Sequence, residues 1–316
     1  MMVGAIWESV WMRMSKVPDM TWFEKSLKRS VLLCFTLFSV FVQAENRGLA
    51  WEVSSPDGAI KGYLMGAVHL ANSSFYPLNP SVLEGFDASS VLMVELDDTL
   101  IEPEEQQRLL EKYAYYPEGQ SYRDHMSGAL ADQIEVMFSS LGVDGAGAIF
   151  ARYKPGLLGV TLAAVQAQAL GYSAQYGIDS YFLEKGRFHK KVEELESFEF
   201  QISLIADLPS DDKTFGDALL NMADFQTEWR GLENAWKEGN ADELYRLAIG
   251  DGLKDFPGLA EYYDLLFFKR NIPMAEKIEQ CVQGEICFVV VGAGHLVGPK
   301  GLVDLLERKG FVLTQM

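Results

Sequence analysis

Two copies of one short pattern, near opposite ends of the chain, constrain its fold most. Gly66–Leu70 and Gly292–Leu296 both read Gly-Ala-x-His-Leu, and each follows an apolar run. Such a run predicts a β-strand, and the glycine after it lets the backbone turn sharply. The 316 residues include four histidines, two of which are His69 and His295 in these patterns. If the two strands are neighbours in one sheet, both imidazoles emerge at the edge where open α/β sheets build their sites.

A carboxylate follows a third apolar strand. Glu95 lies near the end of the run Val91–Leu96. It could cap the sheet edge in solvent, or it could point into the same site as the histidines. Two histidines and one carboxylate are typical of an open divalent-metal site that leaves a position for water or substrate. A bound metal would lower the pKa of that water, and the carboxylate could instead act as the base.

Arg270 and Asn271 lie together in an otherwise apolar and aromatic helical stretch. Asparagine is unusual there because it weakens helices. Arg270 could orient a carboxylate or stabilise an oxyanion, or the two could be a surface pair ahead of the expected helix kink at Pro273.

Other polar residues give weaker signals. Asp179 is expected in the first turn of a helix, and Glu196, after a short strand, could support the site or be solvated. A polar cluster after a strand is usually a solvated loop, as expected for Asp97 and Asp98. His125 and His189 have no strand context, so we expect them at the surface.

The first 44 residues have the pattern of a secretory signal peptide. Lys25, Lys28 and Arg29 precede the apolar stretch Val31–Phe41, and small residues precede a cut after Ala44. The apolar stretch is shorter than the ~20 residues of a spanning helix, although an uncleaved anchor remains the alternative. The mature chain, residues 45–316, is therefore expected to be exported, periplasmic or extracellular, without stable membrane insertion.

The mature chain is strongly acidic. The signal segment contains five of the 27 basic and three of the 45 acidic residues, so the remainder carries a net charge of −20. This charge argues against nucleic acid and anionic membranes as partners. Of the three cysteines, Cys281 and Cys287 survive cleavage, and in an exported protein so close a pair predicts a disulfide.

The order of elements predicts an α/β fold. Strands are expected over 49–54, 60–67, 91–96, 192–195, 286–291 and 311–313, the first two as a hairpin. Helices are expected over 80–86, 102–113, 126–141, 155–170, 178–187, 211–237, 241–249, 258–280 and 301–308. This pattern indicates one domain with a mixed β-sheet core and a large helical insertion at about 102–280.

The motifs in this order resemble the TraB/GumN family, which includes the Tiki metalloproteases. The resemblance runs from Trp51 to the C-terminus, and its carriers are 66–69, 94–96, 176–179, 195–197, 270–271 with Met274, and 292–296 with Gly298 and 301–302. It implies an α/β core like that of erythromycin esterases and ChaN-type haem-binding lipoproteins. It also implies a divalent-metal-dependent hydrolase in which His69 and His295 bind metal. Glu95 would then be a ligand or catalytic carboxylate, and Arg270 and Asn271 would face the substrate or transition state.

These observations lead to the hypothesis of an exported metal-dependent hydrolase, a peptidase acting on a peptide or protein substrate or a related amide or ester hydrolase. The sequence leaves open the choice among manganese, cobalt and zinc, and the oligomeric state. One alternative is a non-enzymatic protein that binds haem or a hydrophobic peptide in an aromatic-lined pocket. The other is a metal-free esterase in which one histidine is the general base.

Overall fold

The computed structural model describes residues 48–316 except 207, 209, 210 and 223. The predicted signal peptide, residues 1–44, lies outside the described residues. Within the described part of the chain, no helix is long and apolar enough to cross a membrane.

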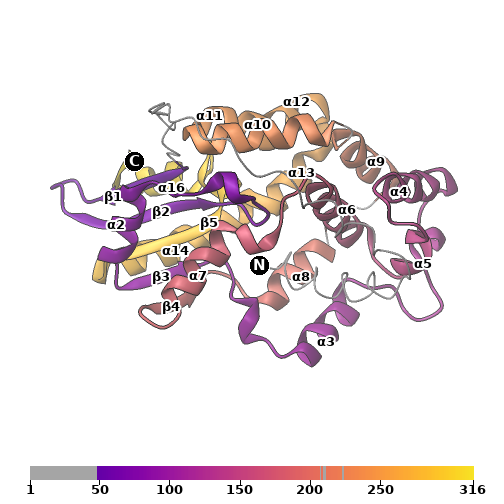
Figure 1. Cartoon of the computed structure of the whole chain (residues 1–316), viewed down its shortest axis with the longest axis horizontal. Helices are drawn as coiled ribbons and strands as arrows, with labels where there is room; N and C mark the ends of the chain where they lie inside the picture. Colours follow the sequence, from indigo (N-terminus) through magenta and orange to yellow (C-terminus); the bar gives the residue numbers. More distant parts are fainter. Residues whose placement is uncertain (1–47, 207, 209–210, 223) are drawn as a thin grey trace, which may run out of the picture.

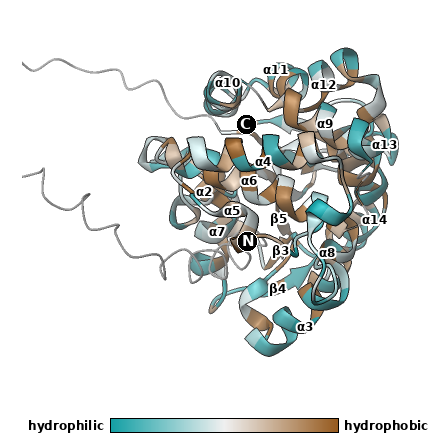
Figure 2. Ribbon diagram, turned by 90° about the vertical axis from the view of Figure 1, so that its right-hand side faces the viewer, coloured by the Kyte–Doolittle hydropathy of each residue, from teal (hydrophilic) through white to brown (hydrophobic). Residues whose placement is uncertain are grey.

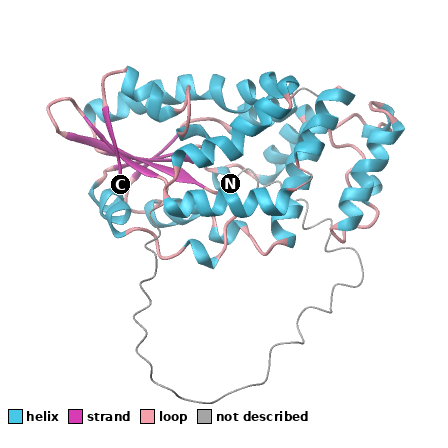
Figure 3. Ribbon diagram, turned by 90° about the horizontal axis from the view of Figure 1, so that it is seen from above, coloured by secondary structure: helices cyan, strands magenta, loops and turns pink. Residues whose placement is uncertain are grey.

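A six-stranded mixed sheet occupies one end of the molecule, and helices form the other (Figures 1 and 3). The strands are β1 (Ala50–Ser54), β2 (Ile60–Ala67), β3 (Val91–Val94), β4 (Lys191–Glu194), β5 (Cys287–Gly292) and β6 (Val312–Gln315). Their order is β4-β3-β5-β2-β1-β6. Strands β4, β3, β5 and β2 run parallel, whereas β1 pairs antiparallel with β2 and β6. The predicted α/β class, mixed sheet and N-terminal hairpin are thereby confirmed.

Helices cover both faces of the sheet. Gly62 and Tyr63 are consecutive in β2, so their side-chain directions point to opposite faces. A Cβ atom at Gly62 would lie 3.2 Å from Val282 in α14 (Lys269–Gly284), whereas the Tyr63 ring lies against Gly85 in α2 (Pro80–Ala88). Helix α7 (Ile178–Gly186) shares the α2 face, because Phe182 and Phe86 both pack on Phe288 of β5. The sheet is therefore the middle layer of three.

The remaining helices build a second hydrophobic core beyond the carboxyl ends of the parallel strands. They include α3 (Pro103–Tyr113), α4 (Gly128–Ser140), α5 (Ala146–Ile149), α6 (Pro155–Ala169), α8 (Phe198–Ala206) and α9 (Asp212–Asn221). Helix α10 (Phe225–Glu238) packs alongside α6 and closes over the strand ends. Figure 2 shows that many helices carry both brown, hydrophobic and teal, hydrophilic residues, as expected for helices with one face toward a core. The segment 102–280 is thus mainly helical, although it also supplies β4.

Three sequence predictions need correction in detail. The single helix expected over 211–237 is two helices, α9 and α10, separated around Met222. The helix expected over 258–280 is α13 (Ala260–Tyr263), the π-helical turn η7 (Asp264–Phe268) and α14, which runs on to Gly284.

The third correction concerns β3, which ends at Val94. Glu95 therefore follows the strand directly.

The other C-terminal elements are α11 (Ala241–Tyr245), the π-helical turn η5 (Arg246–Gly250), α12 (Asp251–Asp255), α15 (Ala293–Leu296) and α16 (Leu302–Arg308).

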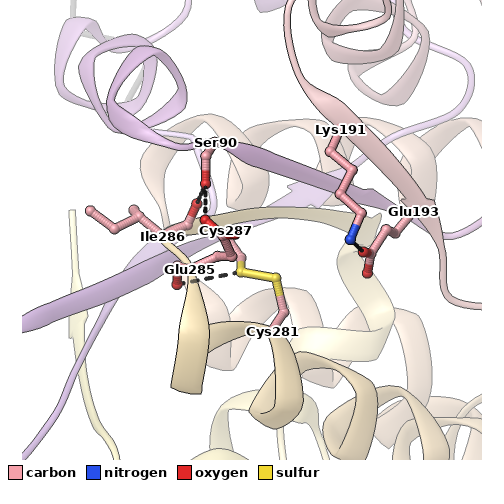
Figure 4. Close-up of a disulfide and its surroundings, with 7 residues drawn as sticks. All are labelled: Ser90, Lys191, Glu193, Cys281, Glu285, Ile286 and Cys287. Carbon is pink, nitrogen blue, oxygen red and sulfur yellow. Dashed lines mark hydrogen bonds and ion pairs between the residues drawn. A yellow bond between two sulfur atoms is a disulfide. The ribbon is translucent and has the colours of Figure 1, made fainter.

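Cys281 and Cys287 form a disulfide, as predicted, with Cα atoms 6.3 Å apart (Figure 4). The bond joins the end of α14 to the first residue of β5. Beside it, the Ser90 hydroxyl donates a hydrogen bond of 2.7 Å to Glu285. The disulfide thus fixes the turn that aligns β5 between β2 and β3.

Replacing both cysteines, Cys281→Ser with Cys287→Ser, should lower the free energy of unfolding by about 2 kcal/mol, because a short closed loop no longer restricts the unfolded chain. Urea unfolding of the oxidised wild type and the double variant measures the difference. Adding reductant should bring the wild type to the variant's midpoint and leave the variant unchanged. Equal midpoints under oxidising conditions would contradict the prediction.

Candidate functional site

Each of the four parallel strands is followed by one polar residue at the same edge of the sheet. In sheet order, Glu196 follows β4, Glu95 follows β3, His295 follows β5, and His69 follows β2. The pairing continues past the strands, since the amide of Glu196 donates to the carbonyl of Glu95, and the amide of Glu95 to Val290. The expectation that the two histidine strands are neighbours is therefore confirmed, and the histidines emerge at one edge.

Gly292, the last residue of β5, is the point around which this row is arranged. A Cβ atom there would lie 3.5 Å from Glu95 Oε2, 3.5 Å from His295 Cδ2 and 3.9 Å from His69 Nε2. The Gly292 amide itself donates to Glu95 Oε2 over 3.2 Å. Gly292 therefore lies next to both imidazoles and the carboxylate.

His295 is held from behind by Asn271. The Asn271 amide nitrogen donates to the Lys300 carbonyl over 2.8 Å, so its oxygen is the atom that faces His295 Nδ1 at 2.6 Å. Nδ1 must then carry the proton, which leaves the lone pair on Nε2. Asn271 is fully buried and does not line the cavity described below, contrary to the expectation that it faces the substrate. Its place in the structure is that of a positioning residue.

His69 is oriented in a similar way by Asp179. Its Nδ1 lies 2.9 Å from Asp179 Oδ2, which again places the proton on Nδ1 and the lone pair on Nε2. Asp179 lies in the first turn of α7, as expected, and is buried. The His69 side chain is 35% exposed, so this imidazole is the accessible one of the pair.

Glu95 belongs to a buried network with Arg270, Glu196 and Gln201. Arg270 Nη2 lies 2.5 Å from Glu95 Oε1 and 2.6 Å from Glu196 Oε2, and its Nε donates to Glu196 Oε1. Gln201, in α8, donates to both carboxylates. Of the two sequence alternatives for Glu196, support of the site rather than solvation is the one observed.

This environment sets the charges. Burial alone would raise the pKa of Glu95, but the neighbouring Arg270 guanidinium holds it well below its usual range. Burial and the neighbouring Arg270 charge lower the pKa of His295 to about 3, so its imidazole is neutral at pH 7. Two carboxylates, those of Glu95 and Glu196, then share one guanidinium, that of Arg270. The site has an excess of negative charge.

A cavity of about 390 Å³ opens beside these groups. Glu95, His69, His295 and Arg270 form one end of it, whereas its walls are mainly apolar side chains. These come from α6, α8, α10, α11, η5 and η7, and they are Val160, Ala163, Ala164, Leu204, Ile205, Trp229, Leu232, Leu244, Ala248, Leu266 and Phe267. The polar groups thus act in a partly water-excluded space, where electrostatic interactions are strengthened.

Other predicted residues lie elsewhere. Asp97 and Asp98 are buried rather than solvated, because the Asp97 carboxylate accepts hydrogen bonds from Thr99 and pairs with Arg187 at 3.1 Å. His125 and His189 are exposed, as expected.

The sequence prediction missed Gln201 because its helix, α8, was not among the predicted helices, and no local signal marks this glutamine as buried. Among the described residues, no three His, Cys, Asp or Glu side chains lie close enough to hold a metal ion as they stand.

Comparison with known proteins agrees with these motifs. A model of the TraB/PrgY/gumN family matches residues 49–315. The chain belongs to this family. The uncharacterized protein YbaP of Shigella flexneri is 26% identical over 263 residues, covering 82% of this chain and 92% of that protein. YbaP of Escherichia coli (strain K12) is 26% identical over 250 residues, covering 78% of this chain and 87% of the relative. No solved structure matches significantly.

Arg270→Met should destabilise the fold by about 3–5 kcal/mol, because it leaves Glu95 and Glu196 buried without their counter-charge. Urea unfolding measures this loss. The loss should shrink at acid pH, since without Arg270 burial raises the pKa of Glu95, and protonation then removes its buried charge. The control is Arg308→Met. Arg308 and its partner Asp304 both lie near the surface, so this substitution should lower the free energy of unfolding by about 1 kcal/mol or less. Equal losses in the two variants would contradict this account.

Proposed function

We propose that this protein is an exported, divalent-metal-dependent hydrolase of amide or ester bonds, with peptidase activity as the leading form. The observation that carries the proposal is the gathering of two imidazoles and one carboxylate around Gly292, at the polar end of an apolar cavity. Family membership adds support for a core related to erythromycin esterases and ChaN-type proteins. Superposing an experimental structure on those folds would test that relation.

The donor set fits a divalent metal in its chemistry. Both histidines direct the unprotonated Nε2 away from a hydrogen-bonding partner at Nδ1, which is the usual arrangement for histidine ligands. Glu95 Oε2 accepts from the Gly292 amide, while Oε1 is held by Arg270 and Gln201. Because the donors are not gathered to coordination distance, a cation would have to draw them together. The excess negative charge favours that step.

A bound metal would supply Lewis acidity toward a carbonyl oxygen and toward water. The chain's own groups have separate tasks. Asn271 and Asp179 hold the two imidazoles in one tautomer. Arg270 keeps Glu95 ionised, so that its carboxylate remains able to bind a cation. The apolar walls exclude bulk water and leave the substrate's reacting group as the polar part that faces the cluster.

A metal-free hydrolase is the second candidate, and the pair of His69 and Asp179 favours it. A partly exposed imidazole with a carboxylate at Nδ1 is the arrangement of a general base. In this candidate His69 takes the proton from water, and Asp179 stabilises the resulting imidazolium. Activity would then survive a chelator and fall on Asp179→Asn.

Protein purified without a histidine tag, after reconstitution with manganese, cobalt or zinc, should contain about one equivalent of metal. The double variant His69→Ala with His295→Ala should contain none, because it lacks both imidazole ligands. His125→Ala with His189→Ala is the matched control, since it removes two exposed histidines and should leave the metal content unchanged. Elemental analysis measures all three.

Metal in neither protein, together with chelator-resistant cleavage of peptide or ester libraries, would reject the metal-dependent hydrolase in favour of the metal-free one. Equal metal content in the wild type and the histidine double variant would reject the proposed ligands.

Export is the remaining part of the proposal, and the disulfide supports it because such bonds persist in oxidising compartments. Expression of the full chain in a bacterial host should place the mature protein outside the cytoplasm with Glu45 as its first residue. N-terminal sequencing of the periplasmic fraction checks this. An intact N-terminus in the membrane fraction would indicate the uncleaved anchor instead.

A further inference from the structure

The apolar cavity adjoins a second chamber. That chamber has a volume of about 240 Å³ and lies between α6, α9 and α10. Five residues line both spaces, so the two chambers share a common wall or neck: Val160, Ala163, Trp229, Leu232 and Ala248. All five are only partly buried, although they are small or apolar. The molecule therefore keeps two adjoining apolar spaces open instead of packing them, with these five side chains between them.

Small residues of α6 make room for this space. Gly159 and Ala163 lie one turn apart on the same side of the helix and line the second chamber. Across from them are Trp229 and Leu232 of α10 and Ala248 of η5. Close packing is normal in protein interiors, so an apolar space of this length joined to a polar cluster indicates an apolar ligand.

The lining decides what kind of ligand suits the space. A peptide backbone in the second chamber would lose its hydrogen bonds to water. Few groups could replace them, because Glu228 and Tyr262 are the polar side chains of a lining that is otherwise apolar. An anionic group, such as a haem propionate or a free carboxylate, would meet the Glu228 carboxylate in the second chamber. A neutral hydrocarbon chain has neither disadvantage and gains from every buried methylene.

We propose that the substrate carries a long acyl chain, which occupies the two chambers and places its amide or ester carbonyl at Glu95, His69 and His295. This inference rests on the proposed hydrolase. In the reaction, the oxygen of one water bonds to the acyl carbon and the carbon–nitrogen or carbon–oxygen bond breaks. The leaving nitrogen or oxygen takes a proton, so the products are a fatty acid and an amine or alcohol.

Binding of a fluorescent palmitamide probe, compared with its butyramide homologue, tests the proposal without need of metal or turnover. We expect the palmitamide to bind the wild type at least about tenfold more tightly, because only the longer chain reaches the second chamber. Ala163→Phe should reduce this preference about tenfold by filling the neck from α6. Ala248→Phe should do the same from the opposite wall, so that one misfolded variant does not decide the result.

Ala169→Phe is the matched control, since it makes the same substitution on an exposed face of α6 and should leave probe binding unchanged. Equal affinities for the two probes would overturn the proposal. So would tighter binding of haemin or of a hydrophobic peptide that Ala163→Phe abolishes. Palmitamide binding without hydrolysis would refute the proposed hydrolase activity and leave the acyl-chain proposal standing. Hydrolysis at a rate that does not depend on the length of the acyl chain would refute the acyl-chain proposal and leave the hydrolase activity standing.

Discussion

The parallel pairing of β5 with β3 on one side and β2 on the other is the constraint on which the rest of the site depends. It brings residues that are more than 200 positions apart in the chain to one edge of the sheet. Because parallel strands all end in the same direction, His69, Glu95 and His295 emerge together without any contact between their sequence neighbourhoods. The disulfide at the start of β5 and the close pairing of Gly62 with Cys287 fix the register that this convergence requires.

Burial then determines the chemistry that each group can perform. The positive charge of Arg270 pairs with the carboxylates of Glu95 and Glu196 in the protein interior, where an unpaired carboxylate would destabilise the fold. Removing His295 from water keeps its imidazole neutral, and Asn271 fixes which nitrogen carries the proton. Lys300, which presents its carbonyl to Asn271, has a left-handed backbone conformation with φ 66°. Strain of this kind persists where the surrounding structure determines it, and here it lies behind a candidate ligand.

Sequence reasoning found the residues that follow strands and missed those that arrive from helices. His69, Glu95 and His295 could be found because an apolar run ending in glycine or a carboxylate is a local signal. Arg270 and Asn271 were noticed for being out of place in a helix, but their roles as partner of two carboxylates and support of His295 depend on α14 crossing the sheet. Gln201 and the burial of Asp97 had no local signal, because each depends on a partner far along the chain.

The sequence by itself determined the mixed α/β class, the hairpin, the disulfide, the two strand-end histidines and, through its motifs, the family. These follow from short-range patterns: hydrophobic periodicity, turn residues and spacing. Tertiary structure alone decided that Asp179 orients His69, that Asn271 stands behind His295, and that an apolar space of two chambers adjoins the cluster. The physical reason is that tautomer, burial and cavity shape arise from contacts between distant segments, and no local stretch of sequence encodes those contacts.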